Sequence, residues 1–140
     1  MVRAVVQIIQ IKNLQFTLLK NYIKDICPNC GTIEQTTKPA KFPYLTFVQM
    51  DNPSYKPTQD SDSKENHVQP MFQVDVYMNN SDMYTAETVI AKADECLQSY
   101  GWERIFGAKP MSSMSTDVAR QTARYQAIVK QNSPNNFTVI

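Results

Sequence analysis

The sequence is poor in the residues on which most catalytic and nucleotide-binding sites depend. It holds one histidine, His67, and only three glycines among 140 residues. Glycine-rich loops that cradle phosphate groups therefore have no counterpart. A Ser-His-Asp or Cys-His arrangement is also excluded as a working hypothesis, because the one histidine lies at the end of a long polar segment. These absences predict that the protein is not an enzyme and carries no cofactor.

Neither an excess of charge nor a long apolar run is present. Lys and Arg number 14 and Asp and Glu number 13, giving a net charge of +1, which indicates neither a basic nucleic-acid-binding surface nor an acidic tail. Polar residues interrupt the apolar N-terminal stretch, so no membrane-spanning segment is expected. With 42% hydrophobic residues, the composition indicates a globular protein made in the cytoplasm, with a single domain over residues 1–140.

Cysteine is scarce and odd in number: Cys27, Cys30 and Cys96. The motif CPNCG has the spacing of half a zinc site, but a structural zinc ion needs four ligands, usually from two such pairs. Only Cys96, on an expected buried helix face, and His67 remain to complete the set. We therefore expect ordinary loop and core cysteines and no metal. A small zinc-dependent binding domain using Cys27 and Cys30 is the alternative from another functional class.

Hydrophobic periodicity predicts two helices and four strands. The helices are 2–24 and 83–100, and the strands are 43–51, 68–79, 102–109 and 116–130. Residues 27–42 are expected to form a connection, and residues 131–140 a short C-terminal tail. The β-branched run VVQIIQI leaves a strand as the alternative for the start of the first helix.

The second helix has the clearest signals. Ser81 or Asp82 can cap its start, and Gly101 follows its end. Apolar residues at spacings of three, four and seven predict a face that packs on a sheet. These residues are Ala86, Val89, Ile90, Ala93, Leu97 and Tyr100.

The order helix, strand, strand, helix, strand, strand predicts an α+β fold. Two hairpins side by side would form a four-stranded, mainly antiparallel sheet with both helices on its apolar face. The other face would carry Asp75, Tyr77, Arg120 and Arg124. Asp75 could then pair with Arg120 or Arg124, either across strands or between subunits. A solvent-exposed face is the equally weighted alternative, because antiparallel sheets commonly have one wet side.

A long polar segment, NPSYKPTQDSDSKENH at residues 52–67, separates the strands of the first hairpin. A hairpin turn needs only about two to five residues. The segment is therefore either a binding arm or a passive hairpin tip, and we favour the arm because long loops in compact domains are often functional. The interface candidates in this arm are Tyr55, Lys56, Asp60, Asp62, Lys64 and Glu65.

Residues 42–130 resemble a family of tailed-phage proteins. The stretch FPYLTFVQMDNPSYKPTQDSDSKENHVQPMFQVDVYMNN is similar to the hairpin of that family in four features. They are a Phe-Pro-led strand, a Met-Asp-Asn turn, a Glu-Asn-His re-entry and a Val-x-Val-Tyr strand that ends in Asn. The stretch RQTARYQAIV resembles the family's last strand, whereas CPNCG is not part of the pattern. The family is that of the tail terminators, also called tail completion or tail-to-head joining proteins.

The resemblance implies a structural virion protein at the head–tail interface. Copies of the chain would form a ring, commonly a hexamer, that caps the tail tube and joins the tail to the head. The implied partners are further copies of itself, the tail tube protein and the head–tail connector protein. Genomic DNA would cross the lumen without sequence-specific binding, and assembly would take place in the host cytoplasm.

Within such a ring, the arm would clasp the next subunit or the tube. The polar face of the sheet would meet a neighbour or line the channel, where balanced charge would let DNA pass without tight binding. A neck or head-closure adaptor, one layer nearer the capsid, is the alternative within the same class.

Overall fold

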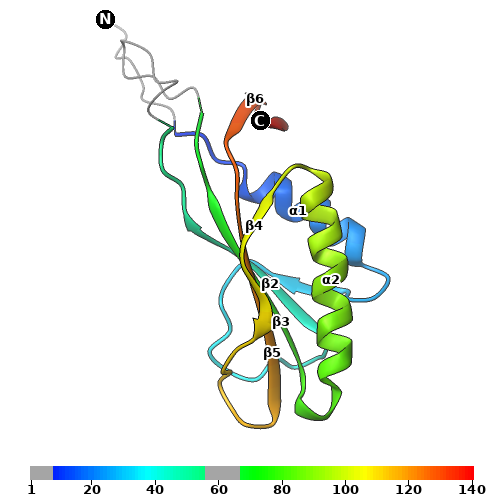
Figure 1. The fold of residues 1–140 in the computed structure, drawn as a ribbon. Coiled ribbons are helices and arrows are strands. Elements are labelled where there is room, and N and C mark those ends of the chain that lie inside the picture. The colour runs from blue at the N-terminus through cyan, green and yellow to red at the C-terminus, as the bar shows by residue number, and fades with distance from the viewer. Residues whose placement is uncertain (1–7, 56–66) are drawn as a thin grey trace, which may run out of the picture.

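The computed structural model describes residues 8–55 and 67–140. Two helices, α1 (Lys12–Ile23) and α2 (Met83–Ser99), lie on the same side of a twisted sheet (Figure 1). A short 3₁₀ turn, Asn80–Asp82, leads into α2. The strands are β1 (Asn29–Gly31), β2 (Tyr44–Asp51), β3 (Met71–Asn79), β4 (Glu103–Pro110), β5 (Val118–Gln126), β6 (Val129–Ser133) and β7 (Asn136–Val139).

The predicted α+β class and the two helices agree with the structure, but the predicted four-stranded antiparallel sheet is wrong. The main sheet has five strands in the order β1-β2-β3-β5-β4, and β1 pairs with β2 in parallel. The extra strand is Asn29–Gly31, which the sequence analysis left in a connection. Three residues of mixed polarity carry no alternating pattern, and backbone pairing alone holds them to Tyr44–Thr46.

The predicted strand 116–130 is also wrong, because it consists of two strands in different sheets. β5 ends at Gln126, and β6 pairs with β7 in a separate two-stranded sheet. Val129 at the start of β6 instead meets Val68, with backbone hydrogen bonds of 3.0 Å and 2.8 Å. The apolar alternation continues from Tyr125 through Ala127 to Val129, so the pattern gave no sign of the change of sheet.

The first helix is shorter than predicted. α1 begins at Lys12, and of the predicted range 2–24, residues 1–7 lie outside the described chain. Burial alternates just before the helix: Ile9 and Ile11 are buried, whereas Ile8 is 64% exposed. That alternation is typical of extended chain, so the strand-like alternative was closer for these residues, although they form no strand.

The second helix matches its prediction closely. Asp82 caps it, because its carboxylate accepts hydrogen bonds from the Thr85 amide at 3.2 Å and the Thr85 hydroxyl at 2.6 Å. Gly101 follows with φ of +97°, a conformation that favours glycine at a helix end. The predicted apolar stripe is buried, apart from Tyr100, which is 41% exposed.

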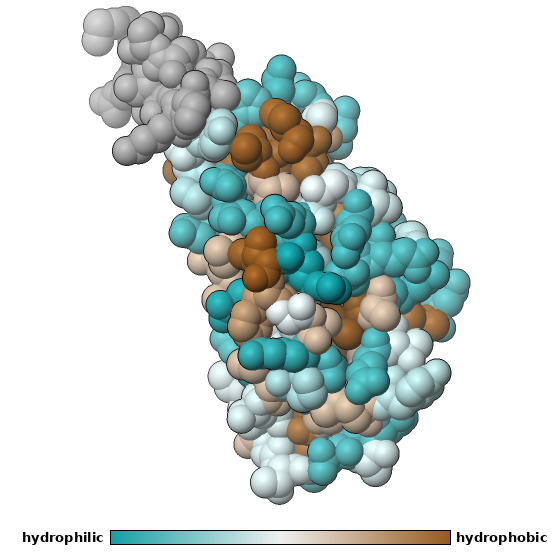
Figure 2. Space-filling model, in the orientation of Figure 1, coloured by the Kyte–Doolittle hydropathy of each residue, from teal (hydrophilic) through white to brown (hydrophobic). Residues whose placement is uncertain are grey.

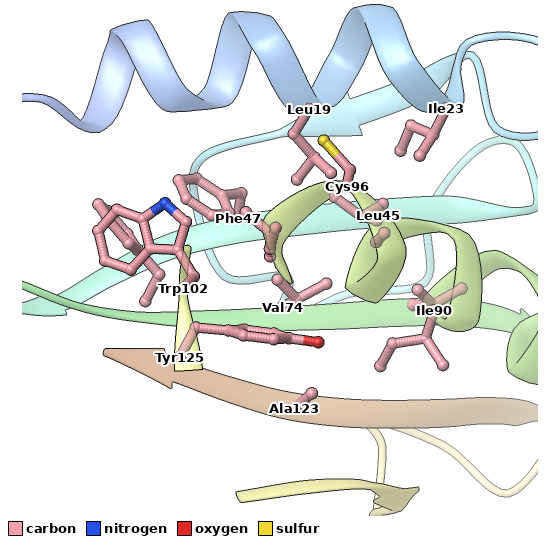
Figure 3. Packing of buried hydrophobic residues seen from close by; sticks show 14 of the residues in the cluster. Leu19, Ile23, Leu45, Phe47, Val74, Ile90, Cys96, Trp102, Ala123 and Tyr125 are labelled. Carbon is pink, nitrogen blue, oxygen red and sulfur yellow. The ribbon is translucent and has the colours of Figure 1, made fainter. Parts of the chain in front are cut away.

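The core fills the space between the helices and one face of the sheet. Figure 3 shows Leu19 and Ile23 of α1 and Cys96 of α2 directed toward Leu45 and the neighbouring strands. At one end of this core, the rings of Phe47 and Phe72 stack with centroids 4.3 Å apart, and Trp102 meets Phe72 edge-on at 5.1 Å. The Trp102 indole donates a 2.8 Å hydrogen bond to Gln15 Oε1, which ties α1 to the start of β4.

Neither helix of the described chain has the length and apolarity that a membrane crossing requires.

Candidate functional site

The pairing of β2 with β3 extends beyond both strands as a narrow stem. We call residues 53–55 and 67–69 the arm stem. The Tyr55 amide donates to the His67 carbonyl at 2.8 Å, and further pairing follows between the same two segments. The stem therefore brings Tyr55 and His67 next to each other at the end of the sheet.

Most of the predicted arm candidates belong to that segment. Tyr55 lies on the stem, where its backbone joins the pairing with His67. The other arm candidates lie outside the described residues: Lys56, Asp60, Asp62, Lys64 and Glu65. Their role at an interface stays a prediction.

Hydrogen-bonding capacity is left over at the stem and at the adjoining end of β2. In the described chain, six side-chain oxygen or nitrogen atoms are buried without a hydrogen-bond partner, and four of them lie here. The four are Gln49 Oε1, Asn52 Oδ1, Ser54 Oγ and His67 Nδ1. Such atoms are rare in folded proteins, and each costs about 1–3 kcal/mol. Within the described chain, buried hydrogen-bonding capacity that no side chain or backbone group satisfies is therefore concentrated at the base of the arm.

An apolar groove of about 420 Å³ lies beside α1 at the C-terminal hairpin. Figure 2 shows hydrophobic side chains gathered in the upper part of the molecule, where Figure 1 places β6 and the C-terminus. The stem adjoins this hairpin, because Val68 and Val129 exchange two backbone hydrogen bonds. We call the stem, the β6–β7 hairpin and the groove together the arm end. The groove is lined by Leu14, Thr17, Leu18, Tyr100, Asn135, Asn136, Phe137 and Val139.

The second face of the main sheet is polar, yet its centre is buried. Asp75 has no exposed surface and accepts hydrogen bonds from three side chains. Arg120 Nε donates at 2.8 Å, Thr122 Oγ1 at 2.5 Å and Gln73 Nε2 at 2.9 Å. With its carboxylate oxygens satisfied in this way, the buried charge of Asp75 is stabilised within one chain.

This arrangement decides between the two predicted pairings of Asp75. Arg120 forms the pair, whereas Arg124 donates to Gln73 Oε1 at 2.8 Å. The register places both arginines two residues from Thr122, which lies opposite Asp75, and Arg124 lies directly opposite the Gln73 that accepts its hydrogen bond. The guanidinium of Arg124 also lies over the Phe106 ring, 5.0 Å from its centroid.

The expectation that this polar face is open to solvent, a neighbour or a channel is wrong at the centre of the face. Tyr77 is 1% exposed, and Asp75 is fully covered. Part of the cover comes from the connection between β1 and β2. Its Glu34 carboxylate lies 3.9 Å from Arg120 Nη2, and its Lys38 pairs with Asp117 at 3.1 Å. The sequence analysis assigned no packing role to this connection, which has no periodic pattern.

Electrostatics at this face favour the charged arginine. Burial alone would lower the pKa of Arg120, but the hydrogen bond and the charge of Asp75 leave that pKa raised. Burial also raises the pKa of the Tyr77 hydroxyl, and the Asp75 carboxylate adds to this effect. The face therefore holds one compensated ion pair and a neutral phenol, which suits a structural role better than acid–base chemistry.

A second polar cluster, which the sequence did not indicate, lies around Asp94 on α2. The Tyr125 hydroxyl donates to Asp94 Oδ1 at 2.6 Å, and Arg104 Nη1 lies 3.2 Å from the same oxygen. Burial, followed by the hydrogen bond to Asp94, raises the pKa of Tyr125. In the sequence, the alternation of apolar residues places Tyr125 on the core face. A buried tyrosine hydroxyl usually has a hydrogen-bond partner, and this is the only sequence signal that could have indicated the contact.

The four residues of the alternative zinc site are not all brought together. Cys96 lies in the core on α2, whereas His67 lies on the arm stem. Within residues 8–55 and 67–140, no group of three or more His, Cys, Asp or Glu side chains could hold a metal ion. Cys27 and Cys30 thus gain no third ligand from the described chain.

No model of a protein family matches the chain, and no curated protein matches it either. Function has to follow from the residues themselves. They divide into a main sheet whose centre is packed on both faces within the chain, and an arm end with unpaired polar atoms and an apolar groove.

Proposed function

We propose that this protein is a structural component of a tailed phage that forms a ring on the tail tube and joins the tail to the head. The observation that carries the proposal is the arm end. There, a long polar segment leaves a paired stem beside four unpaired buried polar atoms and an apolar groove. The resemblance of residues 42–130 to tail terminators supplies the class of assembly to which such an end would belong.

The arm end has the chemistry of a contact surface. Interfaces combine an apolar centre with polar groups that find partners on the other molecule. The groove offers the first through Leu18, Phe137 and Val139, and the stem offers the second through Ser54 and His67. A neighbouring subunit or the tube would supply the missing hydrogen bonds, which would turn a cost for the free chain into a gain on assembly.

A ring follows when such a surface binds a different surface of the next copy. Contacts of this head-to-tail kind close into a ring if the rotation between neighbours divides a full turn. The polar residues of the arm favour the solubility of the free chain before assembly. Balanced charge, with a net value of +1, is compatible with DNA that crosses the ring without being held.

Electron microscopy with tail tubes tests this proposal. The purified full chain would be incubated with tubes assembled in its absence, and then with connector-bearing heads. We expect a ring at one end of each tube and, after heads are added, joined particles. Binding to heads but not to tubes would assign the chain to the neck-adaptor alternative and contradict the terminator assignment. Binding to neither would overturn the proposal.

A further inference from the structure

The two cysteines of CPNCG lie side by side at the end of α1 and differ in access. Cys27 follows the helix, with its amide bonded to the Ile23 carbonyl at 2.8 Å, and its side chain is fully buried. Cys30 belongs to β1 and is partly exposed. The Cys30 sulfur lies 3.4 Å from the Cys27 carbonyl oxygen, and both thiols are free.

The surroundings make the two sulfurs chemically unequal. A hydrogen bond from the Cys27 thiol lowers the pKa of Cys30, and the Lys20 ammonium lowers it further. Burial acts in the opposite direction and offsets part of this effect. The same hydrogen bond, together with burial, raises the pKa of Cys27. A thiolate is the reactive form of cysteine, so the accessible Cys30 is the nucleophile and Cys27 is held in reserve beside it.

We propose that Cys27 and Cys30 form a thiol–disulfide exchange site whose substrate is a small disulfide, with Cys30 as the attacking thiol and Cys27 as the resolving thiol. The site is independent of ring formation. It rests on a buried thiol and a partly exposed thiol that are three positions apart in the chain, with the Cys30 sulfur 3.4 Å from the Cys27 carbonyl oxygen.

The exchange balances in two steps. The Cys30 thiolate attacks one sulfur of a disulfide RSSR; a Cys30–SR bond forms, the S–S bond of the substrate breaks, and RS⁻ leaves and takes up a proton. Cys27 then loses its proton and attacks Cys30 Sγ, so that the Cys27–Cys30 bond forms and the second RS⁻ leaves. Two protein thiols are oxidised, and one small disulfide is reduced to two thiols.

The product would lie at an edge of the main sheet. Cys30 pairs with Leu45 in the parallel contact of β1 with β2, and Cys27 lies 3.5 Å from the Pro43 carbonyl that precedes β2. Oxidation would therefore tie the chain after α1 covalently to the edge strand. Cys96 offers an internal reference, because burial and then Glu95 raise its pKa to about 11 within the core.

Glutathione disulfide tests the site on the reduced full chain. Intact mass should show the loss of two hydrogens without dimers, and brief alkylation of the reduced chain should label Cys30 first. Cys27→Ser should retain one glutathione on Cys30. Cys30→Ser should react at least about tenfold more slowly, because the remaining Cys27 thiol is buried and its pKa is raised. Cys96→Ser, the matched control, should behave like the parent.

Alkylation of the unmodified chain keeps the test independent of how the variants fold. First labelling at Cys27 or Cys96 would overturn the assignment of the nucleophile. A lasting mixed disulfide in the parent chain, with no internal bond, would overturn the role of Cys27. Dependence of the reaction on Cys96, or disulfide-linked dimers as the main product, would contradict the site as a whole.

Discussion

The main sheet and the arm end of this molecule differ in how completely contacts within one chain cover their apolar surface and pair their buried polar groups. Over β2, β3 and β5, the core face is packed by apolar side chains, and the centre of the opposite face is closed by the network around Asp75. At the arm end, four buried polar atoms of the described chain lack partners, and an apolar groove stays open. The difference supports the proposal that interaction is assigned to a region apart from the main sheet.

This division has a physical basis. Buried polar groups stabilise a fold only when their partners are present, and they become costly when a partner is missing. A region that bears such a cost in the free chain gains most from binding. Substitutions in the main sheet should therefore change stability, whereas changes at the arm end should change assembly.

The largest loss of stability is expected from Asp75→Ala. The substitution leaves the Arg120 guanidinium facing a buried site without its carboxylate, which typically costs about 3–5 kcal/mol. Glu103→Ala removes an exposed carboxylate from the same sheet and should change stability by no more than about 0.5 kcal/mol. Urea unfolding of both variants measures the difference. Equal effects would show that the polar face is not a closed part of the fold.

Leu97→Ala should come next, with a loss of about 2–5 kcal/mol for a fully buried leucine on α2. Tyr84, 78% exposed on the same helix, provides the control. Tyr84→Ala should stay within about 0.5 kcal/mol of the parent. If Leu97→Ala cost no more than this control, the packed face of α2 would be misassigned.

Alkaline pH should weaken the main sheet through its buried phenols. The pKa of Tyr125 is raised in the folded chain. Its contribution to folding stability is therefore fully present below about pH 10, the pKa of an unperturbed tyrosine. That contribution is lost as the pH rises further. Each such phenol lowers the free energy of unfolding by up to about 1.4 kcal/mol per pH unit. Tyr125→Phe should lose less stability than the parent between pH 10 and 11. If thermal unfolding showed that Tyr125→Phe and the parent lose equal stability over this pH range, Tyr125 would not be a group responsible for the loss.

The smallest effect on stability is expected from the arm. Replacing residues 56–66 with Asn-Gly keeps the stem, and loop closure changes by only about 0.6 kcal/mol for each halving of length. The same variant should fail to form rings or to join tails to heads. A Gly-Ser segment of unchanged length is the control for side-chain contacts. Normal assembly of both variants would leave the arm as a passive tip.

The sequence predicted the helix–sheet core well, because strong local signals agree there with tertiary contacts. Asp82, the apolar stripe of α2 and Gly101 each mark the helix independently. The alternation of Phe72, Val74 and Val76 likewise marks the buried face of β3. Where the local preferences of the sequence agree with the contacts made in the fold, the sequence pattern alone is sufficient to predict the element.

The remaining features depend on contacts that no local pattern encodes. β1 pairs its backbone with Tyr44–Thr46, and the connection after it contacts the polar face where Glu34 lies 3.9 Å from Arg120 Nη2. The unpaired atoms of Asn52 and His67 become visible only when burial is known. Sequence could therefore locate the arm, but not the incomplete surface at its base.

Photo-crosslinking from the arm stem tests the central claim most directly. Tyr55 would be replaced by p-benzoylphenylalanine, and the protein would be irradiated alone and on tail tubes, with masses compared to the 16.0 kDa chain. The account predicts covalent adducts with a second copy or with the tube protein, formed only under assembly conditions. Assembled particles that yield no adduct from position 55 would contradict the claim that the arm end is the contact surface.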